Sequence, residues 1–124
     1  MAEFLIDTNV LSRIFTGDKN VKDFIETLDA AICTVVYVEC LQGSKSIREK
    51  RIVESYLSRF ELNHITFDID SNHRSDSHVF EYSRLLLADA LIAATCLDVN
   101  LTLVTYNVND FHFIQDLKYL KPSV

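Results

Sequence analysis

Four acidic residues stand where the chain is expected to turn at one edge of a sheet: Asp7, Glu39, Asp89 and Asp110. Asp7 directly follows the apolar residues 4–6, and Asp110 follows an apolar run that ends at Thr105. Glu39 lies about one and a half turns into the helix expected after another apolar run, and Asp89 begins a further helix. Because the carboxyl ends of parallel strands share one edge, where ligands collect, these acids are predicted to meet there.

Carboxylates packed together without a cation raise one another's pKa and resist ionisation. A hard divalent cation removes that cost, and oxygen ligands of this kind suit Mg²⁺ or Mn²⁺. The sequence has no Cys/His cluster typical of zinc, no GxxxxGK[ST] loop and no GxSxG nucleophile elbow. A carboxylate-held Mg²⁺ can activate water beside a phosphodiester, so the predicted reaction class is metal-assisted phosphodiester hydrolysis.

Four neutral polar residues beside the acids could orient the carboxylates by hydrogen bonding: Thr8, Asn9, Thr105 and Asn107. Each also has a simpler interpretation, because such residues cap helices and form turns. For Asn107, the orienting role and the capping or turn role are equally supported. Capping alone also explains Asp7 or Asp89 taken singly. Glu39 differs, since its apolar neighbours predict a mostly buried setting in which a glutamate needs a partner.

Short apolar runs alternate with helical periodicity along the chain. Strands are expected at 4–6, 30–33, 64–67, 101–105 and 117–120, and helices over 10–15, 18–28 and 35–42, then from near Ser44 or Ser46 to Phe60, and over 89–97. Thr34 is the expected cap of the third helix, and a short or irregular helix is expected within 70–84. Strands that alternate with helices predict an α/β fold with a parallel sheet.

The bulk composition describes one soluble globular domain over residues 1–124, with 48% hydrophobic and 24% charged residues. No secretion signal or membrane-spanning run is present, so we expect a cytoplasmic protein. The three cysteines are predicted to be reduced and buried. A net charge of -6 argues against a broad grip on nucleic acid, although residues 45–60 carry five basic residues against two acidic ones.

Four motifs resemble those of PIN-domain ribonucleases, and within that superfamily the chain is most similar to VapC toxins of type II toxin-antitoxin systems. The motifs are Phe-Leu-Ile-Asp-Thr-Asn-Val-Leu at 4–11, Glu39 four residues before Gly43, Leu-Ala-Asp-Ala-Leu-Ile-Ala-Ala-Thr at 87–95 and Leu-Val-Thr-Tyr-Asn-Val-Asn-Asp-Phe at 103–111. They follow one another in order from about residue 4 to residue 122.

The resemblance implies a three-layer α/β/α sandwich with a central parallel sheet. It also implies Mg²⁺- or Mn²⁺-dependent endoribonuclease activity, homodimerisation and inhibition by a cognate VapB-like antitoxin. The acidic quartet of the family falls on Asp7, Glu39, Asp89 and Asp110, with Asp7 and Asp89 most firmly tied to the metal.

Two features depart from the family pattern. Relatives often carry a longer helix and a Gly-containing turn before residue 85, whereas residues 70–84 here are compact and lack glycine. Relatives also often have a basic residue where Tyr106 stands, so one phosphate contact is either absent or replaced by stacking on the ring. Neither departure touches the acidic quartet.

The RNA substrate is expected to be single-stranded or looped, because proteins read RNA mostly in such regions. The basic helix at 45–59 either helps to hold its backbone or binds an acidic stretch of the antitoxin. One alternative is a non-catalytic PIN-like module that binds RNA or protein, although such a module would have no reason to keep all four acids. A second, an aspartate-nucleophile phosphatase, requires an acid two residues after Asp7, where Asn9 stands.

Overall fold

A single five-stranded sheet organises the protein, and its strands all run parallel. The computed structural model describes residues 2–64 and 87–124. In order along the sheet the strands are β3 (Glu61–Asn63), β2 (Ala30–Cys33), β1 (Phe4–Ile6), β4 (Thr102–Val104) and β5 (Tyr119–Leu120). The first strand therefore lies at the centre, paired with β2 on one side and β4 on the other, and its residues Leu5 and Ile6 are buried.

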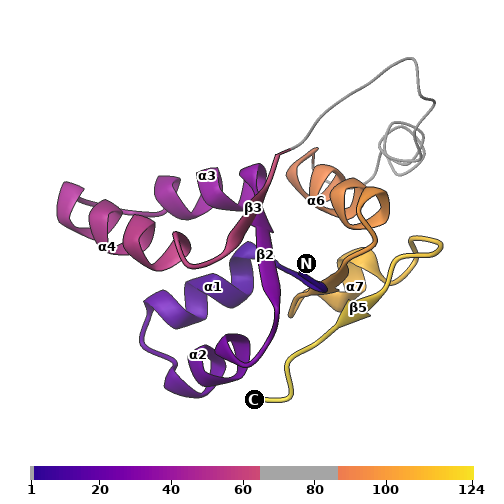
Figure 1. The fold of residues 1–124 in the computed structure, drawn as a ribbon, viewed down its shortest axis with the longest axis horizontal. Coiled ribbons are helices and arrows are strands. Elements are labelled where there is room, and N and C mark those ends of the chain that lie inside the picture. The colour runs from indigo at the N-terminus through magenta and orange to yellow at the C-terminus, as the bar shows by residue number, and fades with distance from the viewer. Residues whose placement is uncertain (1, 65–86) are drawn as a thin grey trace.

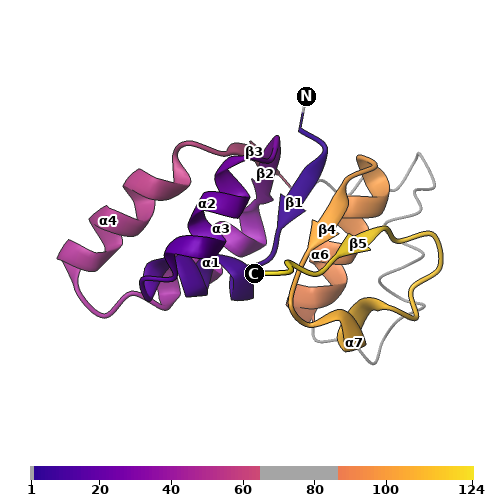
Figure 2. The same ribbon diagram turned by 90° about the horizontal axis from the view of Figure 1, so that it is seen from below.

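Helices cover the sheet on both sides (Figures 1 and 2). The described helices are α1 (Thr8–Phe15), α2 (Lys19–Glu26), α3 (Thr34–Gln42), α4 (Ile47–Leu57), α6 (Leu87–Asp98) and α7 (Val108–Phe111). Both views place α1 to α4 together on one side and α6 on the other. The predicted three-layer α/β/α sandwich with a central parallel sheet is confirmed.

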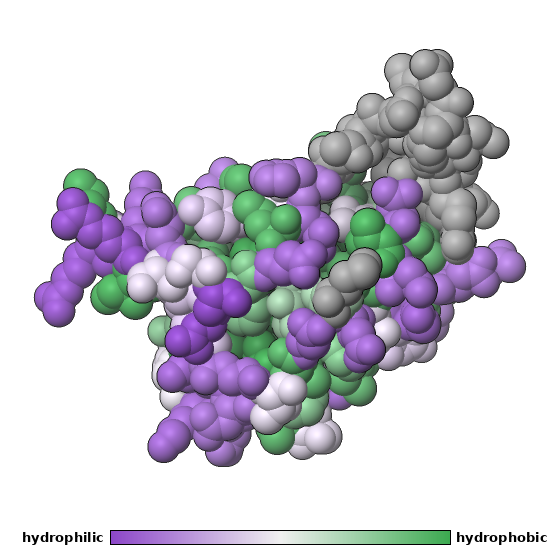
Figure 3. All heavy atoms as spheres, in the orientation of Figure 1, coloured by the Kyte–Doolittle hydropathy of each residue, from purple (hydrophilic) through white to green (hydrophobic). Residues whose placement is uncertain are grey.

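The core lies between these layers and is built from aliphatic side chains and one phenylalanine. At most 1% of the surface is exposed in five of its large side chains, those of Leu5, Leu11, Ile32, Leu103 and Phe111. The three cysteines are free and buried, as predicted. Figure 3 shows hydrophobic residues in the middle of one face with hydrophilic residues around them.

The described helices include none that is long and apolar enough to cross a membrane. A cytoplasmic location stays a prediction.

Three sequence predictions about element positions were wrong. The third strand occupies Glu61–Asn63 instead of 64–67, because the chain already pairs with β2 from residue 61, shortly after α4 ends at Leu57. Residues 108–111, which had no predicted structure, form the short helix α7. Thr34 does not cap α3, since Cys33 takes that position and the Thr34 hydroxyl instead lies 3.3 Å from Nδ1 of His64. The helix expected within 70–84, and residues 65–67 of the predicted strand, lie outside the described residues.

Candidate functional site

Asp7 ends β1 and begins α1, and it is buried, with 4% of its surface exposed. Its Oδ1 accepts a hydrogen bond of 2.7 Å from the backbone N–H of Thr8, so the same carboxylate caps the helix. Its Oδ2 accepts from the Thr105 hydroxyl at 2.8 Å and from the Asn9 amide at 3.0 Å. Capping and a place in the site are therefore compatible, because Oδ1 accepts this one hydrogen bond among the described residues and has a second lone pair.

Thr105 and Asn9 connect the ends of two neighbouring strands around Asp7. The register pairs Ile6 with Val104, which places Asp7 beside Thr105. The Asn9 amide donates to the Thr105 hydroxyl at 3.1 Å, and the Asn9 side-chain oxygen accepts from the backbone N–H of Tyr106 at 3.0 Å. Burial raises the pKa of Asp7. The hydrogen bonds that its carboxylate accepts from Thr105, Thr8 and Asn9 lower the pKa by less, so the net shift is upward.

Asn107 takes part in this network through its backbone. Its N–H donates to the Thr105 hydroxyl at 3.0 Å. The side chain is exposed and makes no capping bond to α7, although Asn107 occupies the cap position. An orienting role for the Asn107 side chain therefore stays a prediction, whereas Thr105 and Asn9 contact Asp7 directly.

Glu39 reaches the same region from α3. Its Oε1 accepts a hydrogen bond of 2.6 Å from the Thr8 hydroxyl, so Thr8 links Glu39 to the helix that Asp7 caps. The expected buried setting was wrong in part: Val36 and Cys40 are buried, but Glu39 is half-buried and Val38 is 43% exposed. The reason is that, among the described residues, no other layer covers one side of α3, which faces open space.

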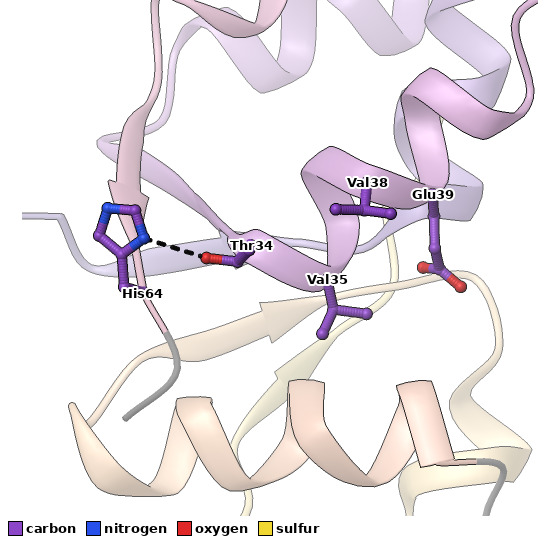
Figure 4. Close-up of a pocket in the computed structure, with 5 residues that line it drawn as sticks. All are labelled: Thr34, Val35, Val38, Glu39 and His64. Carbon is purple, nitrogen blue, oxygen red and sulfur yellow. Dashed lines mark hydrogen bonds between the residues drawn. The ribbon is translucent and has the colours of Figure 1, made fainter. Parts of the chain in front are cut away.

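That open space is a pocket of about 370 Å³ lined by Thr34, Val35, Val38, Glu39 and His64. Figure 4 shows the Glu39 carboxylate at one end of the row and the His64–Thr34 pair at the other. The two valines lie between them, so apolar surface leads up to the acid. His64 was not singled out from the sequence, where it looked like a strand residue.

Asp89 and Asp110 complete the group of acids. Asp89 lies in the first turn of α6, and Asp110 lies on α7 with its side chain exposed. Burial, followed by the charges of Asp7, Asp110 and Glu39 in that order, raises the pKa of Asp89 from 3.8 to about 6. Each of the other three acids therefore lies within electrostatic range of Asp89. Helices α3 and α6 also contact each other directly, which brings the Glu39 and Asp89 elements together.

The chemistry of these donors fits a hard divalent cation. The four candidate ligands are all carboxylates, and burial, followed by the charges of neighbouring acids, raises the pKa values of both Asp7 and Asp89. Within residues 2–64 and 87–124, no three His, Cys, Asp or Glu side chains are close enough to hold one ion together. Mg²⁺ tolerates such an arrangement, because proteins bind it through one or two carboxylates and leave several water ligands in place.

Tyr106 has a neighbour that the sequence did not suggest. The guanidinium carbon of Arg13 lies 3.7 Å from the centre of the Tyr106 ring. Arg13 follows Asn9 by four residues on α1, and that spacing was the available signal, since it puts both side chains on one helix face. A cation therefore stands against the loop that follows β4.

The family model of the PIN domain matches residues 4–114, which is most of the chain and includes all four acids. The chain belongs to the PIN domain family. Among solved structures, this PIN domain is similar to a chain of a toxin-antitoxin complex from Klebsiella pneumoniae. The two are 33% identical, the alignment covers 92% of this chain and 94% of that one, and the TM-score is 0.76.

Two further structures share the fold of this PIN domain at lower identity. One is VapBC2 from Rickettsia felis bound to a promoter DNA fragment, with 23% identity, coverage of 96% and 98%, and a TM-score of 0.81. The other is DNA-bound VapBC from Salmonella typhimurium, with 21% identity, coverage of 98% of each chain and a TM-score of 0.81. A search of curated proteins gave no match to this chain.

Proposed function

We propose that this PIN domain is a Mg²⁺- or Mn²⁺-dependent endoribonuclease and the toxin of a type II toxin-antitoxin pair. The observation that carries the proposal is the group of four acids, in which Asp7, Glu39 and Asp110 all raise the pKa of Asp89. The similarity to a toxin-antitoxin complex across nearly the whole of both chains supports the biological setting.

Asp7 and Asp89 would hold the cation, with Glu39 and Asp110 nearby. When bound, the metal would supply an activated water and stabilise negative charge on the phosphate. Thr105 and Asn9 fix the Asp7 carboxylate through Oδ2, so the remaining lone pair of Oδ1 keeps one orientation. Asp110 is the most exposed of the four and could accept the proton from the attacking water. The substrate would be single-stranded or looped RNA.

The test is cleavage of a single-stranded RNA with Mg²⁺ or Mn²⁺ by the wild type and by Asp7→Asn and Asp89→Asn variants. Both substitutions should reduce cleavage by at least about 100-fold, because each removes a charged ligand with little change of shape. Asp98→Asn is the matched control, since Asp98 ends the same helix as Asp89 and is exposed. If both variants cleave RNA as fast as the control, the proposed site is wrong.

A non-catalytic module that binds RNA or protein is the second candidate. It is favoured by the finding that no three acidic side chains of the described residues converge closely enough to hold one ion. Titration with Mn²⁺ separates the two candidates, because a ligand that binds only the folded state raises the melting temperature. A rise in the wild type that is lost in Asp89→Asn supports the nuclease, and no rise supports the module.

The proposed partner is a VapB-like antitoxin with an amphipathic, acidic segment. A groove of about 290 Å³ between α1, α2 and α4 is lined by Ile14, Phe15, Lys22, Glu49, Ile52, Val53 and Tyr56. Exposed basic residues of α4, including Arg48, Lys50 and Arg51, stand on the helix that forms one wall. An apolar groove with cations beside it complements a helix that has one apolar and one acidic face.

We also propose that the domain forms a homodimer through the exposed apolar surface of α3 and α6. Val38 on α3 is 43% exposed and Leu87 on α6 is 69% exposed, and the two helices contact each other. Exposed apolar surface of this kind marks interaction sites. A dimer would therefore cover side chains that a monomer leaves in water.

A further inference from the structure

Arg13 and Tyr106 form a stacked pair next to the hydrogen-bond network that holds Asp7. The guanidinium carbon of Arg13 lies 3.7 Å from the ring centre. The backbone N–H of Tyr106 donates to the side chain of Asn9, which in turn donates to Asp7. Asn9 and Arg13 are one turn apart on α1, about 6 Å along the helix axis. The stack therefore stands about one helical turn from the residue that fixes Asp7.

The Tyr106 ring is a fixed platform for the guanidinium. Its hydroxyl donates to the carbonyl oxygen of Val124 at 3.2 Å, and its backbone is tied to α1 through Asn9. A guanidinium stacked on such a ring loses much of its rotational freedom before any ligand arrives. The N–H groups along the edge of a guanidinium held over a ring can be donated in pairs to a phosphate.

Arg13 has no carboxylate partner among residues 2–64 and 87–124. The two ion pairs formed there both go to Glu26, from Lys22 and from Arg59. Arg13 itself is exposed. Within the described fold its positive charge is therefore not neutralised by an acid, although the chain as a whole carries a net charge of -6.

The acids create a need for such a cation. Four neighbouring carboxylates repel a phosphodiester, and a metal bound to them would act on the phosphate to be cleaved but not on the phosphates beside it. A cation about one helical turn away can hold an adjoining part of the backbone and keep the strand in register. Arg13 on α1 lies against Tyr106, and the loop that begins with Tyr106 leads to Asp110 four residues later.

We propose that Arg13, stacked on Tyr106, binds a backbone phosphate of the RNA strand beside the one that is cleaved. This inference rests on the proposed ribonuclease function. Arg13 is a positioning residue, and Tyr106 acts through it by holding the guanidinium. The sequence left open whether the phosphate contact at Tyr106 is absent or replaced by stacking on the ring, and in the structure Arg13 covers one face of that ring.

The experiment compares the cleavage of a single-stranded RNA by the wild type and by Arg13→Gln, Arg13→Lys, Tyr106→Phe and Tyr106→Leu variants. The values of kcat and KM are measured at several salt concentrations, and melting temperatures are recorded for each protein. Lys19→Gln is the matched control, because it removes the same charge from an exposed position on α2 that lies outside the basic helix α4 and the groove beside it. Binding of the same RNA to Asp89→Asn and to Asp89→Asn/Arg13→Gln gives affinity without cleavage.

Arg13→Gln should raise KM about tenfold with little change in kcat, as expected for loss of one charge-assisted contact. The slope of log affinity against log salt should become shallower by about 0.7, the value for one phosphate of a single strand. Tyr106→Phe should match the wild type in KM, whereas Tyr106→Leu should raise KM without changing the salt slope. Arg13→Lys should keep the slope and recover part of the affinity.

If Arg13→Gln and Lys19→Gln have the same KM and the same salt slope while the wild type cleaves RNA, the proposal is overturned and the proposed function stands. A lowered melting temperature in Arg13→Gln with unchanged RNA kinetics overturns it as well, because the stack would then be structural only. The proposal is also overturned if Arg13→Gln weakens binding of an acidic protein partner and leaves the RNA kinetics unchanged. If the wild type cleaves no RNA at all, the proposed function fails first.

Discussion

Asp89 is the residue whose charge most clearly depends on its surroundings. Burial and three neighbouring acids raise its pKa from 3.8 to about 6. Between about pH 4 and pH 6 the folded protein therefore keeps a proton that the unfolded chain has already released, so the free energy of unfolding falls as pH rises through this window. Above pH 6 the full cost of the ionised carboxylate is present. Without a divalent cation, Asp89→Asn should be more stable than the wild type at pH 7.5.

Chemical denaturation at several pH values in EDTA measures this difference. Since Asp89 is partly exposed, solvent screening reduces the expected gain to about 1 kcal/mol at pH 7.5, and the gain should vanish near pH 4. Asp98→Asn should show no such pH dependence. Saturating Mg²⁺ should then stabilise the wild type and not Asp89→Asn. An Asp89→Asn protein that is less stable than the wild type at pH 7.5 in EDTA would contradict the assigned cause of the shift.

Single residues were easiest to predict where a strand end fixes them. Asp7, Thr105 and Asn9 meet because β1 and β4 are neighbours in parallel register, and two apolar runs were enough to suggest this. The exposure of Glu39 was not predictable, because it depends on which side of α3 has no neighbouring layer. Arg13 was missed because its partner, Tyr106, lies 93 positions later in the sequence.

At the scale of elements, helix α4 and the groove beside it form the proposed binding surface for the antitoxin. Ile52 lines the groove and is 57% exposed, so the folded protein should tolerate a charge there. Ile52→Asp should weaken binding of the antitoxin-like protein from the neighbouring reading frame by at least about tenfold, because it places a charge in apolar contact surface and repels an acidic segment. Isothermal titration calorimetry measures the affinity.

Ile47→Asp is the control for that experiment, since Ile47 begins the same helix and is 71% exposed but does not line the groove. Both variants should keep wild-type ribonuclease activity in the absence of the partner. Equal binding by Ile52→Asp and the wild type would place the partner elsewhere on the surface.

Element types were predictable from periodicity, whereas some positions were not. Residues 34–42 and 47–57 form helices close to the predicted spans, because Gly43 and Ser46 mark their boundaries. The strand β3 begins three residues before the predicted start, since its residues Glu61 and Leu62 are exposed at the sheet edge and do not form an apolar run. The helix α7 has only four residues, which is too short for helical periodicity to show.

At the scale of the whole molecule, the described residues leave apolar side chains of α3 and α6 exposed, and this predicts a dimer with about twice the 14.2 kDa mass of one chain. Val38→Lys should shift the protein toward the monomer, because a charge at the centre of an apolar interface is costly to bury. Val99→Lys is the matched control, since Val99 is 44% exposed, close to the 43% of Val38, and follows the far end of α6. Light scattering after size exclusion gives the mass of each variant. A wild type that stays monomeric at high concentration would contradict the dimer, and a Val38→Lys dimer as stable as that of Val99→Lys would place the interface on another face.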